Sequence, residues 1–70
     1  MLVIKIGQAI KERGRQLKIT QSYLAEIAEI SINTLYKLET GQTNVTVDVL
    51  EKILDVLGME LKLEVKKLNE

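Results

Sequence analysis

The stretch that decides the fold is residues 20–41, TQSYLAEIAEISINTLYKLETG. It contains two short segments with apolar residues at helical spacing. Each follows a hydroxyl residue, Thr20 or Ser31, whose side chain can accept a hydrogen bond from the free N–H groups of a first helical turn. We therefore expect one helix after Thr20 and a second over residues 32–39, with Gly41 ending the second as a C-terminal cap.

The connection between these two helices is very short. Only Glu29 and Ile30 lie between the first helix and the next cap residue. Helices joined by so tight a turn cannot pack antiparallel and must cross steeply, which is the geometry of a helix-turn-helix unit. The side chains expected to face inward are Leu24, Ile27 and Ala28 in the first helix and Leu35 and Leu38 in the second.

These residues resemble the phage-repressor-like (Xre/Cro) helix-turn-helix family. Counted from Gln21, that family has a small Ala at the fifth position and apolar residues at the fourth, eighth, tenth, fifteenth and eighteenth. This chain matches at every one of them, with Leu24, Ala25, Ala28, Ile30, Leu35 and Leu38. With the flanking helices the resemblance covers residues 6–58, and it implies a mainly α, lambda-repressor-like bundle of four to five helices.

Two positions depart from the family pattern. The ninth, usually Gly because the backbone of the turn tends to be left-handed, is Glu29. A non-Gly residue there costs roughly 1 kcal/mol, so we expect the turn to persist. The family also often has an Arg in its first helix that pairs with the Glu of the second helix of the unit, here Glu39. This chain has Gly14 between Arg13 and Arg15, which leaves the partner of Glu39 open.

Helices are also expected on both sides of the unit. The first begins at Ile4 or Ile6 and ends at Leu17. The last follows the cap residue Thr46 and ends at Gly58. Their expected inner stripes are Ile6, Ala9, Ile10 and Leu17 in the first helix and Leu50, Ile53, Leu54 and Leu57 in the last.

Composition limits the classes of function. A chain of 70 residues allows one domain, and so small a domain usually gains stability from disulfides, a metal or a partner subunit. The chain has no Cys and no His, which excludes disulfides, Cys/His zinc sites and catalysis by imidazole or a cysteine nucleophile. Oligomerisation remains as the source of added stability. We expect a protein that is not an enzyme and has no cofactor or metal.

The start of the chain does not resemble a leader. Its apolar residues 1–4 are followed by Lys5, without a small-residue cleavage site, and are far fewer than the roughly 20 that span a bilayer. The absence of Cys suits a reducing compartment. These features predict a cytoplasmic protein.

Charge is unevenly distributed although the net charge is zero. Residues 1–20 carry five Lys or Arg against one Glu, a local charge of +4. Residues 21–58 carry two Lys against six acidic residues, a local charge of −4, and residues 59–70 balance. A basic first helix is compatible with phosphate contact, although zero net charge is unusual for a DNA-binding protein.

The resemblance implies that residues 32–39 lie in the major groove of DNA. The expected base contacts are Ile32, Asn33, Thr34, Tyr36 and Lys37. Asn33 can bond adenine, Lys37 can donate to guanine, and Ile32 can meet a thymine methyl group. The expected phosphate contacts are Gln21, Ser22, Thr40, Gln42, Thr43 and Asn44. Two other interpretations stay open: a plain polar loop at residues 42–44, and a half-buried Tyr36.

Residues 59–66, MELKLEVK, alternate strictly between apolar and charged, which is typical of a strand with one buried face. A helix through Leu57, Leu61, Val65 and Leu68 also fits, but Gly58 favours a break before a strand. A lone strand would be an exposed edge, so we expect it to pair with its own copy across a two-fold dimer. This divides the chain into a helix-turn-helix DNA-binding domain, residues 1–58, and a dimerisation strand and tail, residues 59–70.

The charges of this strand indicate its register. In an antiparallel pair with Leu63 opposite Leu63, Glu60 faces Lys66 and Lys62 faces Glu64, and each such pair contributes roughly 0.2–1 kcal/mol. A centre at Lys62 or at Glu64 would place like charges opposite each other. The expected dimer interface, packed on the helices, is Met59, Leu61, Leu63 and Val65.

Residues 58–63, GMELKL, and the loop 44–46, NVT, are similar to those of the HipB-type antitoxins, whose C-terminal strands pair across the dimer. The resemblance implies a sequence-specific repressor that binds a palindromic operator as a dimer, regulates its own operon, and has a kinase-type toxin as partner. Two alternatives stay open. One is a phage-like or metabolic repressor without a toxin, and the other is a protein–protein adaptor that uses the same fold.

Overall fold

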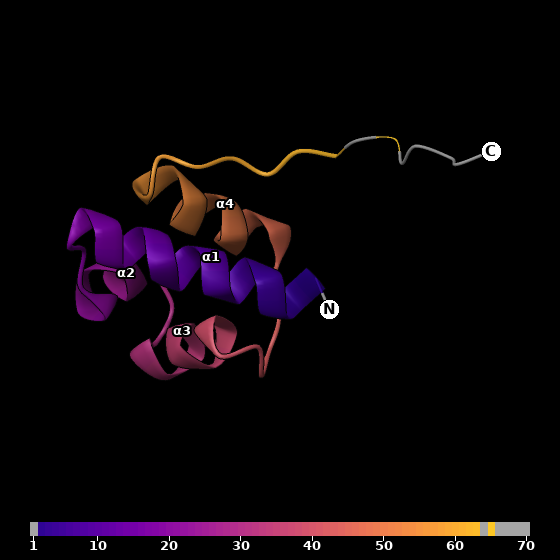
Figure 1. Ribbon diagram of the computed structural model, residues 1–70. Coiled ribbons are helices and arrows are strands. Elements are labelled where there is room, and N and C mark those ends of the chain that lie inside the picture. The colour runs from indigo at the N-terminus through magenta and orange to yellow at the C-terminus, as the bar shows by residue number, and fades with distance from the viewer. Residues whose placement is uncertain (1, 64, 66–70) are drawn as a thin grey trace.

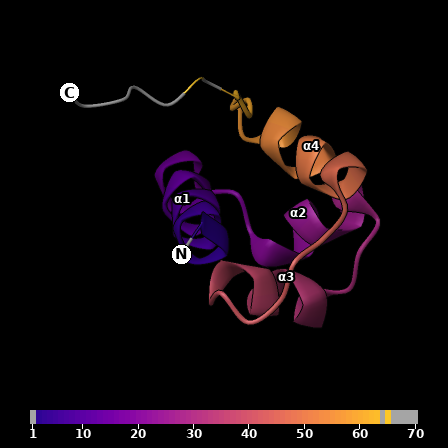
Figure 2. The same cartoon turned by 90° about the vertical axis from the view of Figure 1, so that its right-hand side faces the viewer.

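The structure is a computed structural model that describes residues 2–63 and 65. This part of the chain has four helices: α1 (Leu2–Leu17), α2 (Gln21–Ala28), α3 (Ile32–Glu39) and α4 (Val47–Val56). α1 runs across the bundle between α4 and α3 (Figure 1). α2 lies between α3 and α4 and packs on both (Figure 2). The predicted helix-turn-helix unit is therefore α2 and α3, held by α1 and α4.

The core is built from the apolar stripes of all four helices. Burying each large apolar side chain contributes about 1.5–3 kcal/mol. The buried residues are Ile10, Leu24, Ala25, Ala28, Leu35, Leu38, Leu50, Ile53, Leu54 and Leu57. The stripe expected in the last helix is thus confirmed in full, and so are the expected packing positions of the unit, with Ile30 partly buried against this core.

Three residues expected to face inward do not. Ile27 is 43% exposed and Leu17 is 41% exposed, and Ala9 is also exposed. The expectation for Ile27 is wrong because the inner face of α2 passes through Ala25 and Ala28. The residue next to Ala28 is turned about 100° away from that face. Leu17 is the last residue of α1, where the chain turns away from the core.

The helix starts confirm the capping chemistry expected from the sequence. The Thr20 hydroxyl accepts from the backbone N–H of Tyr23 at 3.1 Å. Ser31 accepts in the same way from Thr34 at 3.0 Å, and Thr46 from Val49 at 3.2 Å. α1 has no such cap in the sequence, and it begins at Leu2, before the expected Ile4 or Ile6.

All four helices end in the same way, on a residue with a left-handed backbone. These residues are Lys18 (φ 58°), Glu29 (φ 61°), Gly41 (φ 78°) and Gly58 (φ 68°). In each case the N–H of the left-handed residue and the N–H of the next residue bond back to carbonyl groups of the last turn, as in a Schellman motif. The left-handed Glu29 was expected, whereas the left-handed Lys18 was not.

The predicted strand at residues 59–66 is not confirmed. Residues 59–63 and 65 form no strand in the part of the chain that the structure describes, and the predicted ion pairs to Glu64 and Lys66 lie outside it. Met59 packs against the core, whereas Leu63 is 97% and Val65 is 96% exposed. The expectation that Leu63 and Val65 pack on the helices is therefore wrong for the single chain. A strand needs a neighbouring strand to satisfy its backbone groups, and the described residues offer none.

The segment after α4 runs along the side of the bundle opposite α3 (Figure 1). Beside it lies a shallow groove lined by Lys5, Ile6, Ala9, Leu54, Met59, Glu60 and Leu61. Among the described helices none has the length and apolar character needed to cross a membrane.

Candidate nucleic-acid interface

The outward face of α3 has the side chains that the sequence predicts for base contact. Leu35, Leu38 and Glu39 are buried, which turns the remaining positions of this two-turn helix away from the core. Ile32 is 49% and Tyr36 is 52% exposed, and both Asn33 and Lys37 are exposed. About half of Tyr36 is therefore buried and half is available for contact, so it fits both the half-buried position and the base contact that the sequence left open.

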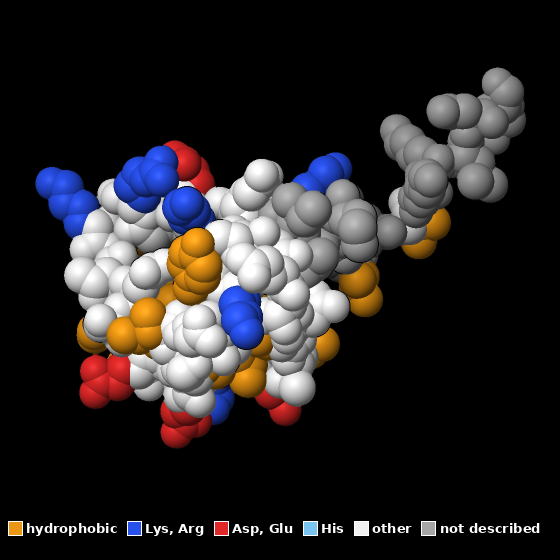
Figure 3. Space-filling view, turned by 90° about the horizontal axis from the view of Figure 1, so that it is seen from below, with side chains coloured by type: hydrophobic (Ala, Val, Ile, Leu, Met, Phe, Trp, Pro, Cys, Tyr) orange, Lys and Arg blue, Asp and Glu red, His pale blue; other side chains and the backbone are white. Residues whose placement is uncertain are grey.

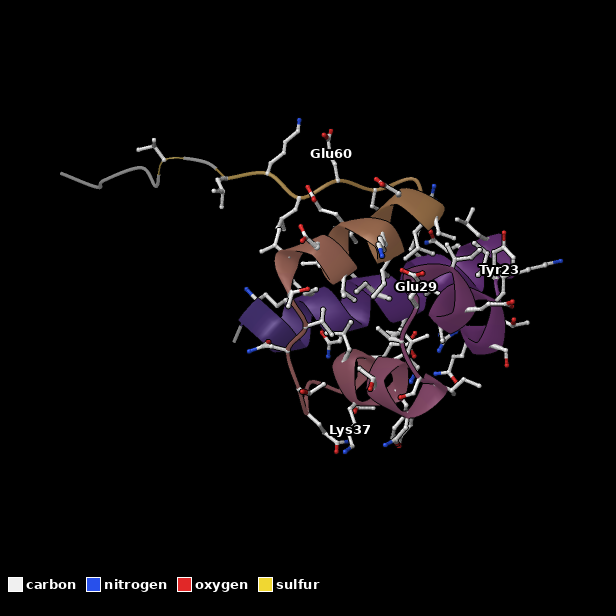
Figure 4. All side chains as sticks on the ribbon, turned by 180° about the vertical axis from the view of Figure 1, so that it is seen from behind. Tyr23, Glu29, Lys37 and Glu60 are labelled. Carbon is white, nitrogen blue, oxygen red and sulfur yellow. The ribbon has the colours of Figure 1, made fainter. Side chains whose placement is uncertain are left out.

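Asn33 and Lys37 lie four residues apart, and side chains at this spacing share one helix face. Figure 4 shows Lys37 pointing away from the bundle, on the side opposite the segment that carries Glu60. Among the hydrogen bonds of the described residues, none involves the side chain of Asn33 or of Lys37. Their donors and acceptors are therefore available to a ligand placed against α3.

Thr34 lies at the edge of this face and is half-buried. The Ser31 hydroxyl donates to the Thr34 hydroxyl oxygen at 2.9 Å while it accepts from the backbone N–H of Thr34. The start of α3 is thus closed by two bonds between the same two residues. The hydroxyl of Thr34 keeps its own proton for a further partner.

The partner of Glu39 is Gln21. The Gln21 side-chain amide donates to the Glu39 carboxylate at 2.7 Å, and Glu39 is only 8% exposed. The two Arg residues beside Gly14 point elsewhere. Arg13 donates to the backbone oxygen of Leu57 at 2.9 Å, and Arg15 lies 3.6 Å from Glu12 on the surface. An uncharged amide from α2 therefore occupies the place that the family gives to an Arg from the first helix.

This bond ties the first residue of α2 to the last residue of α3. It gives Gln21 a structural role beside the phosphate contact that the sequence predicts. In the free chain one N–H of its side-chain amide donates to Glu39, and Gln21 is exposed at the surface. Ser22, the other residue expected to contact phosphate at the start of α2, is exposed.

A depression of about 200 Å³ opens between α1 and the start of α2. Its lining includes the buried Gly14 and Glu39 and the exposed Lys11, Arg15 and Gln21. A Cβ at Gly14 would meet only the backbone oxygen of Ile19, at 3.8 Å, so this position does not close the depression. The fold therefore brings Lys11 and Arg15 to the N-terminus of α2, where backbone N–H groups already favour an anion.

Lys11 and Arg15 were missed as candidate phosphate contacts by sequence reasoning, which noted only that the first helix is basic. Their spacing of four residues does place them on one helix face, and that signal was present in the sequence. The missing information was which face of α1 lies beside α2. That relationship depends on the packing of the whole bundle.

The loop after α3 is polar and partly bonded to itself. The Thr40 hydroxyl donates toward the backbone oxygens of Tyr36 and Lys37, at 3.0 and 3.2 Å. Gln42 donates from its side-chain amide to the Thr40 oxygen at 2.8 Å, and the Thr43 hydroxyl donates to the backbone oxygen of Asn44 at 3.3 Å. These bonds hold the loop beside the end of α3.

Charge on this side of the molecule is asymmetric. Figure 3 shows Lys and Arg side chains mainly along one edge of the face seen from below, and Asp and Glu mainly along the opposite edge. The charged residue exposed on α3 itself is Lys37. A duplex lying on α3 would therefore have cations near one backbone, and mostly uncharged side chains under its bases.

Comparison with known proteins identifies a family that includes α2 and α3. A family model described as a helix-turn-helix matches residues 10–63. Two relatives have names that contain the words HTH-type transcriptional regulatory protein. One is from Methanococcus maripaludis strain S2 (34% identical) and one from Methanococcus vannielii (36% identical), each over 55 residues or 79% of this chain. The chain matches only 17% of the length of these curated relatives, and no solved structure matches it.

Proposed function

This chain belongs to the helix-turn-helix family, and from that membership we propose that it is a transcriptional regulator that binds duplex DNA with α3 in the major groove. The observation that carries the proposal is the outward face of α3. Asn33 and Lys37 are exposed there, without a partner among the described residues, while the opposite face of the same helix holds the core. The protein acts by binding and not as an enzyme.

Bases and phosphates are contacted by different parts of the surface. Asn33 donates to and accepts from adenine, and Lys37 donates to guanine, since these are the pairings that major-groove geometry favours. Phosphate contacts come from the N-terminus of α2, with Ser22 and the neighbouring Lys11 and Arg15, and from the loop at residues 40–44 on the other side. The two groups flank α3, as backbone contacts on both sides of a groove require.

The regulator functions as a dimeric repressor on a palindromic operator. One α3 contacts about half a site, and two copies one duplex turn apart are needed for high affinity in this class. Residues 59–66 supply the contact between copies by pairing as antiparallel strands centred on Leu63. Supporting this, Leu63 and Val65 are almost fully exposed in the single chain, which is unfavourable for two apolar side chains in an alternating segment.

A finer assignment is that the repressor is the antitoxin of a toxin–antitoxin operon, with a kinase-type toxin as second partner. It rests on the similarity of residues 58–63 and 44–46 to HipB-type antitoxins. A phage-like or metabolic repressor would share everything except that partner. Co-purification with the product of the adjacent reading frame tests the assignment, and an adjacent frame unrelated to kinases contradicts it.

DNA binding is tested by fluorescence anisotropy with a pool of randomised duplexes, titrated at several salt concentrations. We expect binding that weakens as salt rises from about 50 to 200 mM, since phosphate contacts release counterions. An adaptor that uses this fold for protein contacts would show no salt-dependent binding, and this result would overturn the proposal. Sedimentation of the full chain and of a chain ending at Gly58 tests the dimer, because an unchanged dimer in the shorter chain contradicts the role of residues 59–66.

A further inference from the structure

Two apolar side chains lie side by side on the outward face of α3. Ile32 and Tyr36 are four residues apart, so one stands directly above the other along the helix. About half of each side chain is exposed, although the helix has a buried face that accepts apolar residues. Hydrophobic side chains are visible among uncharged ones on this side of the molecule in Figure 3.

The proposed ligand explains why this pair faces outward. In the major groove each base pair presents hydrogen-bonding groups, and the one apolar group is the C5-methyl of thymine. Asn33 and Lys37 supply polar contacts in the adjacent row, whereas Ile32 offers a group that can gain only by covering apolar surface. Beside bases that lack a methyl, an apolar side chain has no apolar group to cover and gains less from the contact.

We propose that Ile32 and Tyr36 form a thymine-methyl contact strip, and that the operator half-site of this protein has thymines opposite it. The inference rests on the proposed function, since it concerns the same face of α3, but it specifies which bases that face selects. The two residues are about 6 Å apart along the helix axis, which is close to two base steps of about 3.4 Å. The strip therefore reaches methyl groups on base pairs that are two steps apart.

Because the outward face of α3 carries little charge, the apolar contact of Ile32 and Tyr36 has a larger share in base selectivity. Lys37 is the charged side chain exposed on α3, so little of the contact with the base edges is ionic. Loss of one covered methyl corresponds to about a three- to fourfold loss of affinity, by the transfer free energy of one such group. This effect is small for one site and large enough to measure.

The test begins with duplexes selected by the protein from a pool with a randomised centre. In the selected duplex each thymine is replaced in turn by deoxyuridine, which removes the methyl and keeps every hydrogen-bonding group. We expect about a three- to fourfold rise in Kd at one position of each half-site, or at two positions that are two base steps apart, and no change at the other thymines. Ile32→Ala should remove this dependence at its position, so that thymine and deoxyuridine bind alike.

Ile27→Ala is the matched control, since Ile27 is an apolar residue of similar exposure on α2. It should leave the ratio between the thymine and deoxyuridine duplexes unchanged. Salt-dependent binding with a ratio of one at every thymine would overturn the strip and leave the proposed function standing. Absence of binding to any duplex would overturn both. The wild-type measurement on the substituted duplexes decides the question even if a variant is poorly folded.

Discussion

Gly7 of α1 lies directly against the backbone carbonyl of Leu38 at the end of α3, and a Cβ at position 7 would overlap that oxygen. The contact is between two backbones, so neither side can give way by turning a side chain. α1 and α3 can approach this closely only because residue 7 is Gly. This crossing supports the C-terminal end of the helix that carries the proposed base contacts.

Gly7→Ala and Gly14→Ala form a matched pair with opposite expected signs. The first forces α1 away from α3 and should lower the free energy of unfolding by about 1–3 kcal/mol. The second adds a Cβ that would sit 3.8 Å from the backbone oxygen of Ile19, an ordinary contact, and should raise it by about 0.5–1 kcal/mol through helix propensity. Urea denaturation measures both, and a stable Gly7→Ala protein would contradict the close crossing.

Lys18→Gly should raise the free energy of unfolding by about 1 kcal/mol. Lys18 has φ 58°, where its Cβ is strained and Gly is not. Lys18→Ala is the control, because it removes the same charge and keeps a Cβ in the left-handed backbone. Thermal denaturation of the two variants should therefore separate them, and equal melting temperatures would show that the left-handed residue is not under strain.

Gln21→Ala should destabilise the protein by about 1–3 kcal/mol. It removes the amide that donates to the buried Glu39 carboxylate and leaves that carboxylate short of a partner. Ser22→Ala, at the exposed next position, should change stability little. Urea denaturation measures both variants, and equal stability of Gln21→Ala and Ser22→Ala would contradict the contact.

The ion pair between Glu29 and Lys52 gives a pH dependence whose sign follows from the structure. Lys52 lies 2.6 Å from the Glu29 carboxylate, and its hydrogen bond and charge lower the pKa of that carboxyl. The folded state therefore binds the proton less readily than the unfolded state. The stability contributed by this pair is present above the unfolded pKa, about 4.3 for Glu, and is lost as pH falls through the lower folded value.

Lys52→Gln is the variant that measures this pair. Its melting temperature should fall below that of the wild type at neutral pH, and the difference should shrink below about pH 4. The effect is small because both groups are well exposed. Lys62→Gln, which breaks a looser surface pair with Glu60 at 3.7 Å, serves as control. A difference that stays constant with pH would assign the effect of Lys52 to something other than Glu29.

Asn33→Ala and Gln42→Ala should affect DNA binding in different ways. Loss of Asn33 should cost roughly 1–3 kcal/mol on the preferred duplex and much less on unrelated duplexes, because it removes a base contact. Loss of Gln42 should weaken binding to all duplexes alike, as expected for a residue near phosphate. Competition titrations with preferred and unrelated duplexes measure both, and equal losses with Asn33→Ala would refute its role.

Much of the fold follows from local features of the sequence. Thr20, Ser31 and Thr46 cap their helices as expected, because a cap is a contact between residues only three positions apart. The core positions of α3 and α4 follow from helical periodicity. The left-handed Glu29 follows from its place in the turn, because the geometry of that turn requires this conformation.

The features that could not be predicted depend on contacts between distant segments. The bond from Gln21 to Glu39 and the position of Lys11 beside α2 require the packing of three helices. The close approach of Gly7 to the backbone of Leu38 likewise depends on how α1 crosses α3. For residues 59–66, period-two alternation describes a strand, but alternation alone cannot supply the neighbour that a strand needs.

The four left-handed helix ends have a kinetic consequence. Because α2 ends at the hydrogen-bonded turn of Glu29 and Ile30, the orientation of α3 relative to α2 is already set in the free chain. In the proposed complex with DNA, association would then restrict side chains on an ordered backbone and would require little folding on contact. Substitutions on the face of α3 should therefore leave the association rate nearly constant and act on the lifetime of the complex.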